Sequence, residues 1–181
     1  MARGSTVHQF EIELSDIDRS VYDTLSLRLA RHPSESGSYL VARLLAFALE
    51  QTEGLVFTRG LAASDEPAIW VRDLTGELQA WIEVGTPDGR RLHKASKAAG
   101  RVAVYCHKDP APWLRSLGRE KVHASDEISL IGLPGGTVDA LAESVERRNE
   151  WSVSRIEDVV YVEAGGESYS LPLTRHAWPN A

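Results

Sequence analysis

The pattern of apolar residues between positions 35 and 106 constrains the fold of this chain more than any other feature. Apolar residues recur at helical spacing from about Glu35 to Thr52. Three short apolar runs of strand type follow, at 55–58, 68–71 and 78–84. A second helical segment and a further strand complete the series, at about 88–99 and 101–106. The sequence therefore predicts an α/β domain whose core has the order helix, strand, strand, strand, helix, strand.

Strand patterns also stand at both ends of the chain. Phe10, Ile12 and Leu14 alternate with glutamates, which is the period of a half-buried strand. The same alternation from Leu25 to Leu29 predicts a second strand that pairs with the first. The pair Gly165-Gly166 suits the turn of a C-terminal hairpin, because glycine adopts positive backbone angles. The hairpin strands are expected at 159–162 and 169–173, and a helix, a strand and a helix are expected before them at 112–117, 128–131 and 138–147.

Length and charge restrict the class of protein. A chain of 181 residues is long enough for one well-buried core and short for two, so residues 1–181 are expected to form a single compact domain. The net charge of −6 opposes broad attraction to nucleic acid, so a nucleic-acid partner must bind through a local basic patch. The sequence has no apolar segment of signal-peptide length at its start and no later run of roughly 20 apolar residues. A cytoplasmic protein without a membrane partner is therefore expected.

Signatures of several other chemistries are missing from the sequence. Cys106 is the single cysteine and lies in the apolar run 102–106, so a reduced, buried thiol is expected. No two histidines have the spacing of a structural zinc motif. A Gly-Lys-Ser/Thr phosphate loop and a Gly-x-Ser-x-Gly nucleophile elbow are also absent, which removes the usual NTPase and serine-hydrolase signatures.

Glu83 is the strongest candidate site residue. It follows Trp81 and Ile82 in an apolar strand. A buried carboxylate costs several kcal/mol unless a metal, a cation or water compensates it. Glu83 is therefore expected either to bind a metal ion or, as the competing interpretation, to reach solvent or an arginine such as Arg59 at the end of its strand.

Other carboxylates compete for the place of a second ligand. Asp73 stands at the rim of the predicted hairpin beside Thr75 and Gly76, where aspartate commonly bonds its own backbone as a turn residue. Asp65 and Glu66 lie in a predicted loop before Pro67, and a loop beside the end of the sheet can also deliver a ligand. Asp73 and the pair Asp65 and Glu66 are thus alternatives for one role.

Short segments of the chain, in order, carry a family resemblance. They are Leu29-Ala-Arg-His-Pro-Ser-Glu35, Arg43-Leu-Leu-Ala46, Phe57-Thr-Arg-Gly-Leu61, Asp65-Glu-Pro67, Trp81-Ile-Glu-Val-Gly85, Pro87-Asp88 and Lys94-Ala95. These segments resemble the bacterial YaeQ family, and the order of elements is similar to the core of the PD-(D/E)XK nuclease superfamily, in which that family is a narrower group. The resemblance weakens after about Lys108 and implies a nuclease-like core at about 35–106.

The resemblance implies a magnesium-dependent site. In the nuclease superfamily two carboxylates hold Mg²⁺ and a lysine assists. Here Glu83 would hold the ion together with Asp73, or with Asp65 and Glu66. The lysine usually stands two residues after the second carboxylate, on the same face of the strand, and this chain has Gly85 there.

A lysine from the following helix is the remaining source of the missing cation. Some nucleases of the superfamily use such a lysine, which implies Lys94, with Lys97 one turn on. The apolar face of this helix, however, consists of Leu92, Ala95 and Ala99, roughly opposite the lysines. Simple solvation of both lysines is therefore the competing interpretation.

Two hypotheses follow from these residues. The first is a Mg²⁺-dependent nuclease that acts on nucleic-acid phosphodiesters, with Glu83, Asp73 and Lys94 as catalytic residues. The second is a catalytically inactive binding module that keeps the nuclease scaffold and binds nucleic acid or a protein. Convergence of a second carboxylate and a lysine amine on Glu83 would favour the enzyme.

Overall fold

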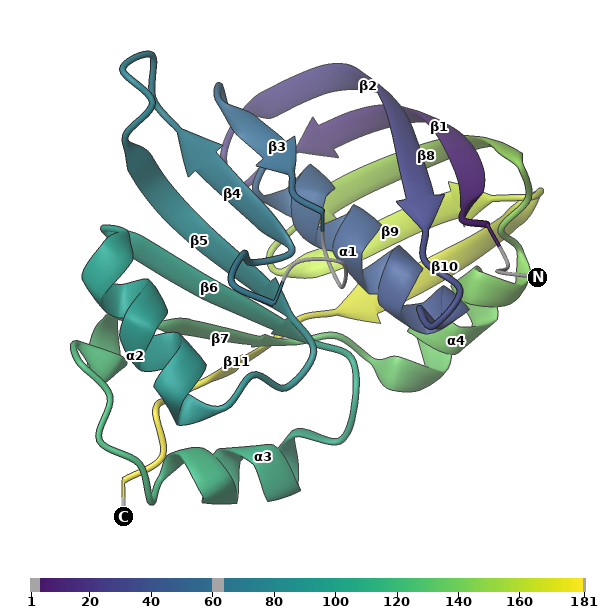
Figure 1. Cartoon of the computed structure of the whole chain (residues 1–181). Coiled ribbons are helices and arrows are strands. Elements are labelled where there is room, and N and C mark those ends of the chain that lie inside the picture. The colour runs from purple at the N-terminus through teal and green to yellow at the C-terminus, as the bar shows by residue number, and fades with distance from the viewer. Residues whose placement is uncertain (1–3, 60–63, 181) are drawn as a thin grey trace.

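The computed structural model describes residues 4–59 and 64–180 (Figure 1), so the first part of the predicted loop at 62–67 lies outside the described residues. The helices are α1 (Gly37–Leu49), α2 (Gly89–Ala98), α3 (Pro110–Leu117) and α4 (Gly135–Glu143), with a short 3-10 helix η2 at Ser125–Glu127. The strands are β1 (Thr6–Asp16), β2 (Val21–Arg31), β3 (Leu55–Phe57), β4 (Ile69–Arg72), β5 (Leu78–Val84), β6 (Arg101–Cys106), β7 (Ser129–Gly132), β8 (Arg148–Ile156), β9 (Val159–Ala164), β10 (Glu167–Pro172) and β11 (Thr174–His176).

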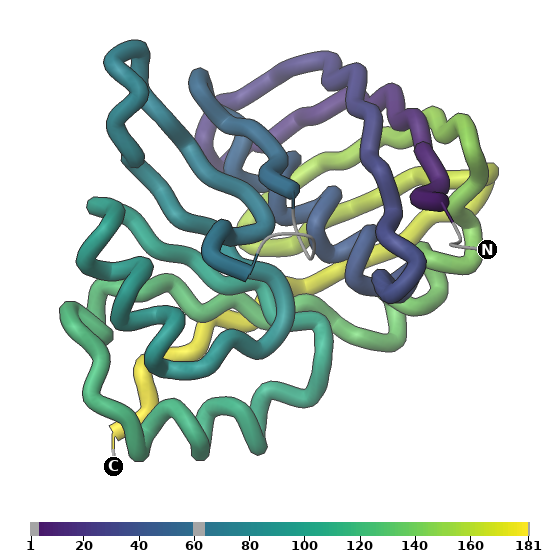
Figure 2. The backbone as a smooth tube through the Cα atoms, in the orientation of Figure 1, coloured from purple at the N-terminus to yellow at the C-terminus, as the bar shows by residue number. Residues whose placement is uncertain are grey.

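The strands form two mixed sheets. The five-stranded sheet has the order β10-β9-β8-β1-β2, and β1 pairs in parallel with β8 and antiparallel with β2. The six-stranded sheet has the order β11-β7-β6-β5-β4-β3, and its central strands β5, β6 and β7 are parallel. After β10 the chain crosses to the edge of the six-stranded sheet and pairs there as β11 (Figure 2).

Helix α1 lies between the two sheets and forms the centre of the molecule (Figure 1). All ten residues from Leu40 to Leu49 are buried, as expected of a helix that is covered on every side. The main apolar cluster joins α1 to inward-facing residues of both sheets, among them Ile12 of β1 and Ile82 of β5. This shared core makes the two sheets parts of one compact domain.

Helices α2 and α3 cover the other face of the six-stranded sheet (Figure 1). Trp81 of β5, Val104 of β6 and Leu92 of α2 belong to a second apolar cluster on this face. Strand residues alternate between faces, so Ile82 points to α1 whereas Trp81 and Glu83 stand on the face that α2 covers. The buried Leu92 and Ala95 confirm the predicted apolar face of α2.

The predicted α/β class and the order of elements from α1 to β6 are confirmed. The N-terminal strand pair and the C-terminal hairpin are also confirmed. Strand β8 was not predicted, and it joins that pair and that hairpin into a separate sheet. Helix α4 begins three residues before the predicted start at 138 and ends before 147, because the chain must turn into β8 at Arg148.

Side-chain caps set the starts of the helices around the site. Ser36 caps α1, because its side-chain oxygen accepts from the amide of Tyr39 at 3.0 Å. Asp88 caps α2 by accepting from the amide of Arg91 at 2.8 Å. No described helix is long and apolar enough to cross a membrane.

Candidate functional site

The candidate site lies where the parallel strands β5 and β6 end. Carboxyl ends of parallel strands meet at one edge of a sheet, and ligands of α/β proteins usually bind there. Two cavities of about 360 Å³ each adjoin at this edge and share Tyr39, Val84 and Thr86. We call the one that Glu83 lines the Glu83 cavity and the one that His107 lines the His107 cavity, and both together the edge cleft.

Glu83 is buried, with 5% of its surface exposed. Its Oε1 atom accepts hydrogen bonds from Arg91 Nε at 2.5 Å and from Trp81 Nε1 at 2.7 Å. Burial raises the pKa of the Glu83 carboxyl, and the hydrogen bonds from Arg91 and Trp81 oppose this shift. The carboxylate that the sequence predicted to need compensation is thus compensated by an arginine.

Arg91 ties the end of β5 to the loop before β4. It stands in the first turn of α2, where the Asp88 cap fixes the backbone. Its Nη1 atom donates to the carbonyl of Ser64 at 2.5 Å, and its Nη2 atom donates to the carbonyl of Glu66. The guanidinium therefore satisfies Glu83 and two backbone carbonyls together.

The competing interpretation, that Glu83 reaches an arginine, agrees with the structure, but Arg59, the example given, is not that arginine. Arg59 pairs instead with Glu66, with 3.0 Å between Nη2 and Oε1. This bond is the main reason that the pKa of the Glu66 carboxyl is lowered. Arg91 was not among the predicted site residues, although its place one turn into the helix after β5 brings it over the face that carries Glu83.

Asp73 lies at the far end of its hairpin from Glu83. Arg72 pairs with Leu78 whereas Ile69 pairs with Ile82, so roughly 16 Å of strand separates the two carboxylates. Asp73 Oδ1 accepts from the amide and hydroxyl of Thr75, at 2.9 and 2.6 Å. These contacts hold the pKa of Asp73 below its usual value. The structure therefore does not bring Asp73 to Glu83, and Asp73 has the contacts of a turn residue.

Asp65, Glu66 and Lys94 lie near Glu83 without converging on it. Glu66 offers its backbone carbonyl to Arg91 while its carboxylate turns to Arg59. The Nζ atom of Lys94 donates to the carbonyl of Asp65 at 3.4 Å and lies 5.7 Å from the centroid of a Trp81 ring. No contact joins Lys94 or either carboxylate to the Glu83 carboxylate among the described residues.

The magnesium ion stays a prediction, and the described contacts bring no second carboxylate to Glu83. Mg²⁺ requires oxygen ligands in octahedral geometry, commonly with one or two carboxylates. Within residues 4–59 and 64–180 no group of three or more His, Cys, Asp or Glu side chains can hold a metal ion. The nearest cation to Glu83 is instead the guanidinium of Arg91.

The backbone conformation at position 85 explains why glycine, and not the usual lysine, stands there. Its φ angle is +100°, a conformation that residues with a Cβ atom adopt only with strain. The amide of Gly85 donates to the carbonyl of Tyr105 at 2.9 Å. Gly85 is therefore still bonded to β6, and the chain bends there as β5 ends.

His107 is a site residue that the sequence prediction missed. It follows β6 directly and is 6% exposed. Its ring packs edge-on against Tyr39 with 6.3 Å between centroids, and its Nδ1 atom is buried without a hydrogen-bond partner in the described part of the chain. Burial lowers the pKa of His107 and so favours the neutral ring. Only the pairing of β6 between β5 and β7 reveals that His107 reaches the same edge as Glu83.

The exposed face of α2 is basic. Arg90, Lys94 and Lys97 stand at spacings of four and three residues, so they share one side of the helix. The helix contains no acidic residue. Among the residues that the structure describes, none of the three cations forms an ion pair with a carboxylate. We call this set the α2 stripe.

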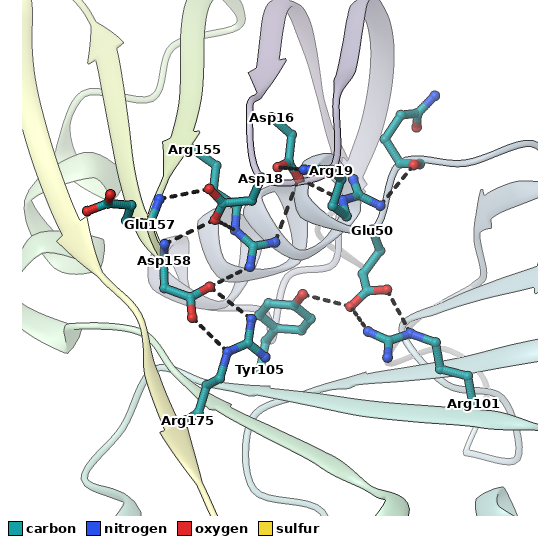
Figure 3. A network of polar contacts seen from close by, with 11 residues as sticks. Asp16, Asp18, Arg19, Glu50, Arg101, Tyr105, Arg155, Glu157, Asp158 and Arg175 are labelled. Carbon is teal, nitrogen blue, oxygen red and sulfur yellow. Dashed lines mark hydrogen bonds and ion pairs between the residues drawn. The ribbon is translucent and has the colours of Figure 1, made fainter.

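A second cluster of charged side chains, of which Asp16, Glu50 and Arg155 are buried, lies at the other end of α1 (Figure 3). Arg155 of β8 contacts Asp16, Asp18 and Asp158, and Arg175 of β11 also binds Asp158. Nearby, Glu50, the C-cap of α1, accepts from Arg101 and from the hydroxyl of Tyr105, both at 2.7 Å. We call these residues the inter-sheet network: Asp16, Asp18, Glu50, Arg101, Tyr105, Arg155, Asp158 and Arg175.

Comparisons with known proteins agree with this architecture. The family model described as YaeQ protein matches residues 1–173. A relative from Salmonella typhi named "Uncharacterized protein YaeQ" is 32% identical over 180 residues, which cover 98% of both chains. A protein of the same name from Escherichia coli K12 is 41% identical over 111 residues, 61% of each chain.

Two solved structures have the same fold along almost the whole chain. The crystal structure of YaeQ protein from Pseudomonas syringae has a TM-score of 0.87 and 31% identity, and the match covers 98% of both chains. The YaeQ structure from Xanthomonas axonopodis pv. citri has a TM-score of 0.86 and 34% identity, covering 97% of this chain and 99% of that one. The fold, the full-length family match and these relatives together show that the chain belongs to the YaeQ family.

Proposed function

We propose that this protein is a nucleic-acid-binding protein whose Glu83 site works without a metal ion. The observation that carries the proposal is the bond from Arg91 Nε to Glu83 Oε1 at 2.5 Å. A guanidinium at this position supplies the positive charge that a magnesium ion supplies in a nuclease. It holds the loop before β4 in place but offers no activated water, so the site binds and does not cleave.

The α2 stripe supports nucleic acid as the partner. Arg90 and Lys97 are seven residues apart on α2, which is about 10 Å along the axis. Positive side chains without carboxylate partners release counterions when they bind phosphates, and this release drives the association. The α2 stripe begins beside Arg91, so a nucleic-acid strand that lies along the stripe reaches the edge cleft.

Fluorescence anisotropy of labelled oligonucleotides tests this function. We expect single- or double-stranded DNA or RNA to bind in EDTA, without a requirement for Mg²⁺, and to remain intact with and without Mg²⁺. We plot the logarithm of the affinity for a single strand against the logarithm of the salt concentration. Three phosphate contacts of the α2 stripe should contribute about −2 to the slope of this plot. The triple variant Arg90→Ala, Lys94→Ala, Lys97→Ala should lose this part of the slope.

A variant with the same charge change elsewhere serves as the control. Arg28, Arg147 and Arg148 are exposed on or beside the five-stranded sheet, so their joint replacement by alanine should leave binding nearly unchanged. Equal losses in the two triple variants would mean that net charge alone drives binding, and the α2 stripe would not be the nucleic-acid surface.

A Mg²⁺-dependent nuclease is the second candidate function. The raised pKa of the buried Glu83 carboxyl, beside a cavity at the edge of a parallel sheet, is the kind of feature that active sites show. This function requires Arg91 to leave Glu83. Cleavage of DNA or RNA by the purified protein with Mg²⁺, lost in Glu83→Ala, would establish it and overturn the metal-independent proposal.

A further inference from the structure

Glu83 presents one carboxylate oxygen to the Glu83 cavity without a partner for it. Its Oε1 atom accepts both of its hydrogen bonds, from Arg91 and from Trp81. Its Oε2 atom has no hydrogen-bond partner within residues 4–59 and 64–180, and it is not among the polar side-chain atoms there that are closed off from solvent. An ionised carboxylate oxygen is an acceptor only, so the group that it binds in this cavity is an N–H or O–H donor.

Tyr39 adds a hydroxyl to the same cavity wall. This hydroxyl has no hydrogen-bond partner in the described part of the chain and is not closed off from solvent either. Burial is the main reason that the pKa of Tyr39 is raised, and the charge of Glu83 adds to the shift. The hydroxyl therefore keeps its proton and lies close enough for the charge of Glu83 to act on it. The cavity thus offers a donor near an acceptor.

The remaining wall of the Glu83 cavity is mainly apolar. Pro67, Ala68 and Val84 are buried, and Pro87 is half-buried. The volume of about 360 Å³ is in the lower range of small-ligand sites. Apolar walls with a few directed polar groups suit a flat ring whose faces pack on the walls and whose edge forms hydrogen bonds.

The Glu83 cavity adjoins the α2 stripe. A neighbouring cavity of about 320 Å³ is lined by Arg90 and Lys94 of the stripe, and it shares Ser64 and Arg91 with the Glu83 cavity. Phosphate contacts position a strand, whereas contacts to base edges read its sequence. A strand whose phosphates bind the stripe can therefore place a base next to Glu83.

We propose that the Glu83 cavity binds one unpaired base that carries an exocyclic amine, and that this amine donates to Glu83 Oε2. The inference rests on the proposed function, which supplies the strand. Cytosine, adenine and guanine have such an amine. Uracil has a carbonyl oxygen where cytosine has its amine, and this oxygen would face the carboxylate as a second acceptor. The site should therefore prefer cytosine to uracil.

Proton–nitrogen correlation spectra of labelled protein, titrated with cytidine and with uridine, test the site without a phosphate group. The indole N–H of Trp81 donates to Glu83, so its signal reports on that carboxylate. We expect cytidine to shift this signal saturably with a Kd on the order of 1 mM, and uridine to bind about tenfold more weakly. Equal affinities for the two nucleosides, or no shift of the Trp81 signal with either, would overturn the proposal.

Matched variants connect the preference to the cavity. Glu83→Gln keeps an oxygen for Arg91 and replaces the free acceptor by an amide donor, so the preference for cytidine should disappear. Glu77→Gln makes the same charge change at an exposed residue outside the cavity wall and should keep the preference within about twofold. A preference that survives Glu83→Gln, or that both variants lose, would contradict the site. Should Glu83→Gln not fold, Tyr39→Phe tests the same cavity, because it removes only the hydroxyl. It should weaken cytidine binding about threefold, and an unchanged affinity would contradict the proposal.

Short single strands of cytosine or uracil nucleotides separate this inference from the proposed function. Tighter binding of the cytosine strand, with the difference lost in Glu83→Gln, would support a strand base in the cavity. Equal binding of both strands through the α2 stripe would overturn the inference and leave the proposed function intact. Cytidine binding by a protein that binds neither strand would support the cavity as a site for a free amine-bearing base and overturn the proposed function.

Discussion

Both ends of α1 carry buried carboxylates paired with arginines, but the two groups differ in how many ion pairs they join. In the inter-sheet network, Asp158 accepts from Arg155 and Arg175, and Asp18 accepts the amides of Glu157 and Asp158 at 2.8 and 3.1 Å (Figure 3). In the edge cleft, Glu83 is paired with one arginine, and His107 has a buried nitrogen without a hydrogen-bond partner in the described chain. Arg155 Nε of the network has no hydrogen-bond partner there either, but it lies 3.2 Å from Asp18 Oδ2.

The pKa shifts also differ between the inter-sheet network and the edge cleft. Arg175 and Arg155 hold the pKa of Asp158 well below its ordinary range, so its charged form is the favoured one. Burial raises the pKa of Glu83 in spite of Arg91. Burial also raises the pKa of Tyr105 in the network, where its hydroxyl donates to Glu50 and keeps its proton. We infer that the network stabilises the packing of the two sheets and that the cleft retains capacity for a ligand.

Removal of Arg155 should have the largest effect on stability. The side chain is 10% exposed and contacts three aspartates, of which Asp16 is fully buried. Arg155→Ala removes one cation from each aspartate, while Arg19 still pairs with Asp16 and Arg175 with Asp158. The expected loss is therefore about 3 kcal/mol, measured by urea unfolding. Arg148→Ala, at an exposed position on the same strand, is the control. A loss below about 1 kcal/mol would mean that the network behaves like a surface ion pair.

Removal of Arg91 should have an intermediate effect. Arg91→Ala leaves Glu83 buried beside Trp81 without its cation, and the expected loss is about 1–3 kcal/mol. The double variant Glu83→Gln, Arg91→Ala should recover part of this loss, because the buried charge is gone. Strictly additive losses in the double variant would contradict a direct interaction between the two side chains.

Replacement of Gly85 should cost less. Gly85→Ala places a Cβ atom on a residue with φ of +100° but meets no neighbouring atom, so only backbone strain of about 1–2 kcal/mol is expected. Gly136→Ala is the matched control, because Gly136 lies inside α4 with open space around it and alanine favours the helix. Equal thermal midpoints for the two variants would contradict a conformational requirement at Gly85.

The pH dependence of unfolding should separate the two regions. The pKa of Asp158 is lowered from 3.8, so its contribution is present above pH 3.8 and is lost as the pH falls. The pKa of Glu83 is raised from 4.5, so its contribution is present below pH 4.5 and is lost as the pH rises through the raised value. Asp158→Asn should therefore flatten the acid side of the stability profile.

Glu83→Gln should act on the other side of that profile. Its stability relative to the wild type should rise as the pH increases above 4.5, because glutamine has no proton to lose. Urea unfolding at a series of pH values measures both variants. Parallel profiles for Glu83→Gln and the wild type would contradict the raised pKa.

Local periodicity was enough to predict most of the fold. The alternation of Phe10, Ile12 and Leu14 and the helical spacing of α1 are signals that neighbouring residues carry themselves. Strand β8 was missed although Trp151 and Val153 alternate with polar residues, because the next inward position is Arg155. A charged residue at a buried position breaks an apolar pattern, and only the aspartates of other elements explain it.

Less of the site could be predicted from the sequence, because it too depends on residues of other elements. The burial of Glu83 followed from its own strand, and the alternative interpretation of Asp73 as a turn residue matches its contacts. The partner of Glu83 depends on how α2 packs on β5, and the role of His107 depends on the parallel pairing of β6. These are long-range relations, which short sequence windows do not contain.

The central claim is that the Arg91 guanidinium, in place of a metal ion, compensates the charge of Glu83. Titration calorimetry with Mg²⁺ and Mn²⁺ tests this claim most directly. The account predicts the same weak or absent heat of binding for the wild type and for Glu83→Ala. It also predicts that Arg91→Ala is the variant most able to gain metal binding, because its Glu83 carboxylate no longer pairs with a guanidinium. Saturable binding of either metal by the wild type that is lost in Glu83→Ala would contradict the account.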